Sequence, residues 1–266
     1  MLYVLEGVRV SLCLAFFVYA SWSDYKTREV SNTVWIVLAP FALLLTTLQL
    51  YLFVPESWST YVLSFALTSV LSVVLFYAGA FGGADAKALI CLALALPLYP
   101  TGLLQPLFGS VSPLFPITVF SNGVLLAVTS IFYSIVRNYL WKAKTRKSLF
   151  EGFEHVSLGR KILTLVCGYK VNFTELKKTT HSYPLEDVRV TEEGQTERSL
   201  LTFPKDEERT AIVDRISTAV KVGRLPEEVW ITPGLPMLIF ITLGLIVALF
   251  LGDFLWIFLR LILGHM

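Results

Sequence analysis

Two aspartates, Asp24 and Asp85, are the side chains whose type and position could support catalysis. Each stands where a long apolar segment meets a short polar one, in "YASWSDYKTREVSN" and "GAFGGADAKAL". Two carboxyls that share a site do not readily ionise together, so their pKa values separate. The ionised carboxyl then takes a proton from water, while the protonated one hydrogen-bonds a scissile carbonyl and later protonates the leaving amine. The pair predicts peptide hydrolysis by water, with the two roles unassigned because such a pair titrates together.

Each aspartate also has an ordinary explanation, because acids at the ends of membrane helices are often only solvated. Three glycines favour a function for Asp85: Gly79, Gly82 and Gly83 omit side chains, so that another helix or a substrate backbone could come close. Lys87 could act in two ways: its charge could lower the pKa of a neighbouring carboxyl, or its side chain could anchor the helix at the lipid surface. Two acids on one membrane face make a stronger hypothesis than either acid alone.

The elements that must position these acids are long apolar segments. The chain has 266 residues, of which 55% are hydrophobic, a composition typical of a polytopic membrane protein. A spanning helix needs roughly 20 mostly apolar residues. Six segments meet this requirement, with approximate bounds 3–22, 33–54, 60–81, 86–105, 114–136 and 236–263. The fourth is the weakest, because Pro97 and Pro100 should kink or end it.

Basic residues predict the orientation of these segments. Lys26 and Arg28 follow the first segment, Lys87 begins the fourth, and a basic run from Lys142 to Lys147 follows the fifth, whereas the opposite loops carry no base. By the positive-inside rule, the N-terminus then lies outside and the basic loops lie in the cytoplasm. A multi-pass protein of the cell membrane is expected, with both aspartates at its cytoplasmic face.

A polar segment separates the fifth apolar segment from the sixth, since 30 of the 42 charged residues lie between Lys142 and Glu228. We expect a mainly α protein with a small α+β cytoplasmic domain inserted before its last helix. The expected parts are a five-helix membrane domain, a polar domain and a sixth transmembrane helix, over 1–141, 142–232 and 233–266. Within the polar domain the expected strands are 161–171, 183–190 and 199–204. An amphipathic helix is predicted over 205–226, with Gly223 ending it.

Other chemistries find little support. The net charge of +2 arises from one polar domain attached to a membrane body, and no nucleic-acid partner is expected. Cys13, Cys91 and Cys167 are far apart and form no C-x-x-C, so we expect packing residues and no zinc site or disulfide framework. We predict no metal and no cofactor, because no metal-binding motif is formed by the three histidines, His155, His181 and His265.

Two further candidates are weak. Ser23 and Lys26 lie about one helical turn apart, as a Ser/Lys hydrolase would need, but such a spacing often arises by chance. Asp253 would lie about 25 Å along the last helix at 1.5 Å per residue, far from Asp24 and Asp85. We expect a structural or solvated role for Asp253.

Two motifs carry a resemblance to a known family. "GGADAK" resembles the G-x-G-D motif of intramembrane-type aspartyl proteases, and "SDYKTREVSN" resembles the first-aspartate segment of the type IV prepilin peptidases. The chain as a whole is similar to their archaeal branch, the preflagellin peptidases. This resemblance implies that Asp24 and Asp85 are the catalytic pair and that Gly82 is the first motif glycine. Ala84 stands where the family has its second motif glycine.

The resemblance also separates this chain from neighbouring families. Bacterial bifunctional prepilin peptidases carry paired C-x-x-C motifs and methylate the new N-terminus, so the absence of C-x-x-C implies cleavage alone. Presenilin-like proteases place Tyr before the first aspartate and carry a Pro-Ala-Leu motif, whereas Ser23 precedes Asp24 and the last helix begins with "GLPM".

The function implied by the resemblance is removal of a short basic leader from preflagellin or type IV pilin-like precursors. Cleavage would follow a small residue at the cytoplasmic membrane face. The implied partners are these precursors, membrane lipids and, through the polar domain, components of a secretion machinery. The alternative is a non-enzymatic transporter or scaffold with a paired-carboxylate proton site. That alternative predicts polar residues deep within several helices, where mostly scattered Ser and Thr occur.

Overall fold

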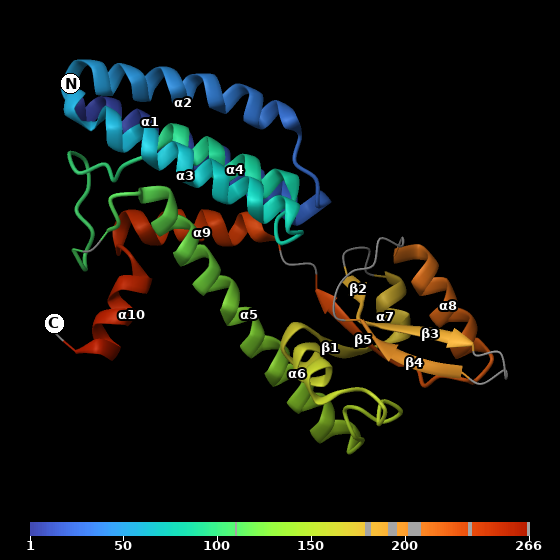
Figure 1. The fold of residues 1–266 in the computed structure, drawn as a ribbon. Coiled ribbons are helices and arrows are strands. Elements are labelled where there is room, and N and C mark those ends of the chain that lie inside the picture. The colour runs from blue at the N-terminus through green and yellow to red at the C-terminus, as the bar shows by residue number, and fades with distance from the viewer. Residues whose placement is uncertain (110, 179–181, 191–195, 202–208, 234–235, 265–266) are drawn as a thin grey trace. The chain divides into compact units, whose positions relative to one another are not determined.

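The computed structural model describes residues 1–109, 111–178, 182–190, 196–201, 209–233 and 236–264. They form two compact units, Met1–Ala127 with Pro236–Met266, and Val128–Leu235 (Figure 1). The first unit is helical, and the second combines short helices with antiparallel strands. The long helix α5 (Phe115–Thr145) belongs to both units, since its first part lies in one and its last part in the other.

The helices of the first unit follow the apolar segments. They are α1 (Leu2–Thr27), α2 (Asn32–Phe53), the 3-10 turn η1 (Pro55–Ser57), α3 (Trp58–Tyr77), α4 (Gly83–Ala95), the start of α5, α9 (Met237–Phe250) and α10 (Phe254–Leu263). Among the described residues, α1, α2, η1 with α3, and α5 are long and apolar enough to cross a membrane, and the bent pair of α9 and α10 provides a possible fifth span. The chain is therefore a membrane protein.

Helix α4 is short and lies at the centre of this unit. It ends at Ala95, two residues before Pro97, so the predicted termination by proline is confirmed. Its 13 residues extend only about 20 Å, less than the hydrocarbon thickness of a bilayer. It packs against α1, α2, α3 and α9, and its buried residues are mostly Ala and Leu (Figure 1). The prediction of six spans stays a prediction.

Helices α5 and α9 approach each other closely at two glycines. A Cβ atom on Gly244 would lie 2.4 Å from the carbonyl oxygen of Val119, and one on Gly123 would lie 3.0 Å from that of Phe240. Only glycine fits at such a backbone contact without movement of a helix. The "LGLI" stretch of the last apolar segment therefore contains a packing site.

The last apolar segment is broken, so the expected single helix over 236–263 is wrong. Helices α9 and α10 meet at a bend of 67°. Gly252 adopts φ +105°, and Asp253 caps α10 by accepting the N–H groups of Leu255 and Trp256 at 3.0 and 3.2 Å. The hydroxyl of Thr118 also donates to Asp253, which is buried. The structural role expected for Asp253 is confirmed.

The second unit contains a three-stranded antiparallel sheet of order β1-β5-β2 and a separate β3-β4 pair. Its elements after α5 are α6 (Leu158–Cys167), β1 (Tyr169–Asn172), α7 (Phe173–Lys178), β2 (Ser182–Pro184), β3 (Glu186–Val190), β4 (Thr196–Leu200), α8 (Arg209–Lys221) and β5 (Glu228–Pro233). In the register of the sheet, Tyr169 opposes Ile231. Apolar side chains of α7, α8, β1 and β5 form the core, including Leu176, Ile216 and Val229.

Sequence reasoning was partly wrong in this unit. The strand expected over 161–171 is helix α6 up to Cys167, because Leu158, Ile162 and Leu165 recur at helical spacing. The strand expected over 183–190 is confirmed as β2 and β3, and the predicted helix is confirmed as α8. Its end before Gly223, which has φ +72°, is also confirmed. The strand expected over 199–204 begins earlier, as β4, and residues 202–208 lie outside the described residues.

Candidate functional site

Asp24 lies in the last turn of α1 and is half-buried. The helix ends there because Arg28 adopts a left-handed conformation (φ 58°) and donates its backbone N–H to the carbonyl oxygen of Asp24 at 2.9 Å. The hydroxyls of Ser23 and Thr27 both donate to the carbonyl oxygen of Glu29, at 2.8 and 3.0 Å. These bonds hold the turn after α1, so the backbone beneath the Asp24 carboxyl is fixed.

Asp85 lies in the first turn of α4 and is also half-buried. Its carboxylate accepts the backbone N–H of Gly82 at 2.9 Å, which caps the helix and uses the favourable interaction of a negative charge with a helix N-terminus. A Cβ on Gly82 would lie 3.2 Å from that same carboxylate oxygen. The first motif glycine therefore makes room for the folded-back carboxylate of Asp85.

The other two glycines have different roles. Gly79 adopts φ +73° in the turn after α3, a conformation that favours glycine, and it has open space around it. A Cβ on Gly83 would make only ordinary contact with Phe76, at 3.7 Å. Ala84 packs against the apolar core of the unit. The tightest of these contacts is therefore local, between Gly82 and the Asp85 carboxylate, and the predicted approach of another helix or a substrate backbone stays a prediction.

Helices α1 and α4 run antiparallel, which places both aspartates at one end of the pair. At the opposite end, the Arg9 guanidinium donates to the carbonyl oxygen of Ala95 through Nε at 2.9 Å and Nη2 at 2.6 Å. Arg9 also contacts Gln49, whose amide donates to Glu6 at 3.2 Å. This buried network caps α4 and fixes its position along α1, and hence the level of Asp85 relative to Asp24.

The two carboxyls lie within electrostatic reach of each other. Burial, the largest effect, raises the pKa of the Asp85 carboxyl to about 6. The hydrogen bond from Gly82 opposes this shift, and the negative charge of Asp24 adds to it. A carboxyl with this pKa changes its protonation state close to neutral pH, as a general acid or base must.

Lys87 and the Ser23–Lys26 spacing do not form the contacts that a catalytic role would need. The Lys87 ammonium donates to the Asn32 side chain at 2.7 Å, which joins the start of α4 to the start of α2. Within the part of the chain that the structure describes, Lys87 forms no ion pair with either aspartate. The hydroxyl of Ser23 is bonded to a backbone carbonyl, and the Lys26 ammonium lies 5.0 Å from the centre of the Trp22 ring.

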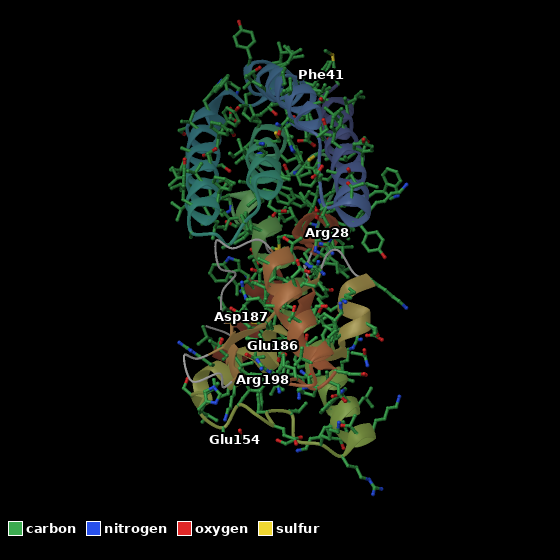
Figure 2. The ribbon with its side chains drawn as sticks, turned by 90° about the vertical axis from the view of Figure 1, so that its right-hand side faces the viewer. Arg28, Phe41, Glu154, Glu186, Asp187 and Arg198 are labelled. Atoms are coloured by element: carbon green, nitrogen blue, oxygen red, sulfur yellow. The ribbon has the colours of Figure 1, made fainter. Side chains whose placement is uncertain are left out.

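Arg28 is the site residue that sequence reasoning treated only as a topological signal. Its guanidinium, labelled in Figure 2, acts electrostatically on Asp24, and its Nε–H is buried and has no hydrogen-bond partner among the described residues. The described residues provide no ion-pair partner for it. The available signal was its position four residues after Asp24, one helical turn along the chain. A buried donor without an acceptor carries a free-energy cost, so the Nε–H of Arg28 is a feature of this site that needs an explanation.

The remaining metal and cysteine expectations concern residues away from this site. Among the described residues, no group of three or more His, Cys, Asp or Glu side chains is arranged to hold a metal ion. His155 contacts the carbonyl oxygen of Arg198 at 2.7 Å, whereas His181 and His265 lie outside the described residues. The expected packing role holds for Cys13 and Cys91, which are buried. It is wrong for Cys167, which is exposed at the end of α6.

The first unit is a helical membrane body with two carboxyls at one end of α1 and α4, and the second unit is a small domain of strands and helices. These features indicate a membrane protein with a paired-carboxylate site. A family model described as "Type IV leader peptidase family" matches residues 11–140, and one described as "Archaeal Peptidase A24 C-terminus Type II" matches residues 160–254. The chain belongs to the type IV leader peptidase family, as its two motifs predict.

Curated relatives agree with this assignment over most of the chain. The preflagellin peptidase of Methanococcus voltae is 30% identical over 241 residues, which cover 88% of this chain and 91% of the relative. The preflagellin peptidase of Methanococcus maripaludis is 27% identical over 89% of this chain and 91% of the relative. That of Methanocaldococcus jannaschii is 24% identical, over 88% and 89% respectively.

Proposed function

We propose that this protein is a membrane aspartic endopeptidase that removes the short basic leader from preflagellin or type IV pilin-like precursors. Membership of the leader peptidase family and the names of the relatives support the reaction and its substrate. The observation that carries the catalytic assignment is the convergence of Asp24 and Asp85 at one end of the antiparallel pair α1 and α4. No cofactor enters the proposed reaction.

The proposed mechanism gives each carboxyl one role. Asp85 carries a proton, because its raised pKa of about 6 keeps part of the population protonated near neutral pH. Asp24 is then the carboxylate that takes a proton from water. The water oxygen attacks the scissile carbonyl while Asp85 hydrogen-bonds the carbonyl oxygen. The leaving amine is then protonated as the tetrahedral intermediate collapses.

Arg28 and the glycine turn are the proposed substrate contacts. Among the described residues the Nε–H of Arg28 has no partner. We propose that it donates a hydrogen bond to a peptide carbonyl oxygen of the substrate, which would hold the leader in extended form beside Asp24. Gly82 and Gly83, which carry no side chain, are the proposed backbone contacts next to Asp85. Lys87 acts here as a link between α4 and α2.

The proposed topology has six membrane segments, with α4 as a short one, and places the N-terminus outside. Asp24, Asp85 and the polar unit then lie at the cytoplasmic face of the cell membrane. A precursor would place its hydrophobic helix in the bilayer beside the enzyme and its basic leader in the cytoplasm, so that the scissile bond meets the carboxyls at the interface. The polar unit is proposed to contact the leader or components of the secretion machinery.

The proposal is tested by incubating the purified protein with a purified preflagellin in detergent and measuring product masses. The expected result is one cut after a small residue, which releases the intact leader and the mature chain. A preflagellin that lacks its leader serves as the control and should stay uncut. An intact precursor after prolonged incubation with folded protein, or cuts spread along the chain, would contradict the proposed function.

A further inference from the structure

A cavity in the second unit, apart from the aspartates, has features that the proposed peptidase reaction does not use. Its volume is about 230 Å³, and its lining includes Trp141 of α5, Lys170 of β1 and Arg198 of β4. Lys147, Glu151 and Glu228 also line it. A cavity of this size holds a group such as a phosphate, and its polar lining distinguishes it from a packing void.

Lys170 is the central residue of this cavity. Its side chain is buried, with 6% of the residue exposed. The ammonium lies 4.6 Å from the centre of the Trp141 ring and 5.8 Å from that of Trp230. Within the described part of the chain, this ammonium donates no hydrogen bond and forms no ion pair. Cation–π contacts compensate only part of the cost of burying a charge, and nearby acids act on Lys170 only without direct contact, so a bound anion could supply a direct partner.

Arg198 provides a second donor that has no acceptor. Its Nη2 donates to both carboxylate oxygens of the fully buried Glu186, at 3.2 and 3.0 Å, and the two residues lie close together in Figure 2. This pairing fixes the guanidinium, whose Nε is buried and has no hydrogen-bond partner among the residues that the structure describes. A buried donor without an acceptor costs about 1–3 kcal/mol in general. Arg198 and Lys170 both line the cavity, and an anion bound there would supply acceptors for the Nε–H of Arg198 and the ammonium of Lys170.

The acids around the cavity are largely engaged by other bases. Glu186 is paired with Arg198, and Glu228 is paired with Lys147 at 3.4 Å. Glu151 is exposed, and its backbone carbonyl accepts from Arg198 at 3.4 Å. The charge of Lys170 is therefore the one that a bound anion would neutralise directly.

We propose that this cavity binds a phosphate-bearing anion, held by the ammonium of Lys170 and the Nε–H of Arg198. Oxygen atoms of a phosphate accept several charge-assisted hydrogen bonds at once, which fits two fixed donors of this kind. This site does not depend on the proposed peptidase function, and its failure would leave that function untouched.

The position of the cavity along α5 indicates a lipid headgroup as the source of the phosphate. Trp141 lies in the last part of α5, next to Lys142 and Lys144, and an aromatic residue followed by bases at the end of an apolar helix is typical of the headgroup level of a membrane. Asn138, one turn earlier, donates to the carbonyl oxygen of Gly168 at 2.8 Å, which fixes the end of α6 at this level.

Helix α6 has the composition of a helix that lies in a membrane surface. Its side chains Leu158, Ile162 and Leu163 are exposed, and Arg160 and Lys161 lie between them in the sequence. An exposed apolar face with adjacent bases is typical of interfacial helices that bind anionic lipids. Because α6 is joined to α5 at Asn138, it supports a cavity at the level of the headgroups.

The test is native mass spectrometry of the full-length protein in a phosphate-free maltoside detergent. The two probes are phosphatidylglycerol and inorganic phosphate. We expect one phosphatidylglycerol bound per wild-type chain, weakened about tenfold or more in Lys170→Met, the loss typical of a charge-assisted hydrogen bond. Lys221→Met removes the same charge from an exposed position of α8 and should leave binding unchanged.

The two probes separate the sources of the phosphate. Binding of phosphatidylglycerol that depends on Lys170 supports the headgroup, whereas Lys170-dependent binding of inorganic phosphate alone supports the site with a soluble ligand. Equal binding to wild type, Lys170→Met and Lys221→Met for both probes would overturn the proposal. Lys170→Met should also unfold at a temperature no lower than wild type, because it replaces a buried, unpaired charge with an apolar group of similar length.

A pH series tests the same site without any substitution. Burial lowers the pKa of Lys170 to about 8; Glu186, Glu228 and Glu151 oppose this shift, and Arg198 adds to it. The ammonium is thus charged at pH 7 and mostly neutral at pH 9.5. Wild-type binding should weaken over this interval, and binding that is constant from pH 7 to pH 9.5 would contradict the role of Lys170.

Discussion

The pH dependence of cleavage provides a quantitative test of the role proposed for Asp85. Its raised pKa of about 6 arises mainly from burial, with a further increase from the charge of Asp24. If Asp85 must be protonated, activity is fully present below pH 6 and is lost as the pH rises through this value. At pH 8, two units above the pKa, about 1% of a group with this pKa remains protonated. We therefore expect kcat/KM at pH 8 to lie about a hundredfold below its maximum.

The assay is hydrolysis of a preflagellin peptide by purified protein in detergent, with kcat/KM measured from pH 5 to pH 9. The peptide should carry a blocked N-terminus and no His or Cys, so that no substrate group titrates in this interval. Single-turnover rates at saturating enzyme then separate the chemical step from binding. The slope of log kcat/KM against pH should approach −1 on the alkaline side, the value for loss of one proton.

Lys87→Met is the matched control for this experiment. Lys87 lies two residues from Asp85 but binds Asn32, and it is not among the causes of the shifted pKa of Asp85. The alkaline midpoint should therefore stay unchanged in Lys87→Met. A rate that stays constant up to pH 8, or rises through this interval, would refute the assignment of Asp85 as the proton donor. A midpoint that moves upward in Lys87→Met would show that Lys87 lowers the pKa of a catalytic carboxyl.

Three further substitutions test other parts of the structure. Arg28→Gln should lower kcat/KM about tenfold, since a charge-assisted hydrogen bond is lost, and Arg28→Lys should restore it only in part; activity equal to wild type in both would contradict a substrate contact. Gly244→Ala should lower the melting temperature, because its Cβ would lie 2.4 Å from the Val119 carbonyl oxygen and overpacking costs about 1–3 kcal/mol. Gly159→Ala is the control, because a Cβ at Gly159 would lie in open space. Equal melting temperatures for the Gly244→Ala and Gly159→Ala variants would refute the close contact. Asp253→Ala should destabilise by about 1 kcal/mol through the lost cap, yet the folded fraction should cleave normally; loss of cleavage in folded protein would assign Asp253 a functional role.

Much of the membrane body could be predicted because its signals are local. Runs of apolar residues define α1, α2, α3 and α5, and Pro97 ends α4 by the absence of a backbone N–H. The break between α9 and α10 was missed because an apolar run was treated as continuous. Its signal is the pair Gly252–Asp253 before a second apolar run, which is a helix start.

The second unit shows where local reasoning fails. Residues 158–167 contain β-branched and apolar residues that fit a strand, yet these residues recur at helical spacing. The spacing of apolar residues is a stronger signal than the strand propensity of single residues, and it correctly indicates a helix here. The central strand β5 was not identified, although "EVWITP" is rich in β-branched and aromatic residues; Val229, Trp230 and Ile231 are all buried, so no alternation of burial marks this strand. Its importance depends on pairing with β1 and β2, which are distant in the chain.

The candidate site was predictable at the level of residues but not of contacts. Charge distribution alone predicted that Asp24 and Asp85 lie at the same end of the apolar helices, and in the structure both lie at one end of the pair α1 and α4. The hydrogen bond between Asp85 and Gly82 and the unpartnered Nε of Arg28 depend on how α1 and α4 pack. That packing is set by Arg9, 15 residues before Asp24, through its bonds to Ala95. Such a long-range contact has no signature in a single sequence.

The measurement that tests the central claim most directly is cleavage of preflagellin by Asp24→Asn and Asp85→Asn, each purified in folded form. Both substitutions keep the shape of the side chain and remove its acid–base function, so each should lower kcat about a hundredfold or more. Glu56→Gln makes the same change at an exposed carboxyl in the opposite loop and should cleave like wild type. Cleavage within a few-fold of wild type by either asparagine variant would contradict the carboxyl pair.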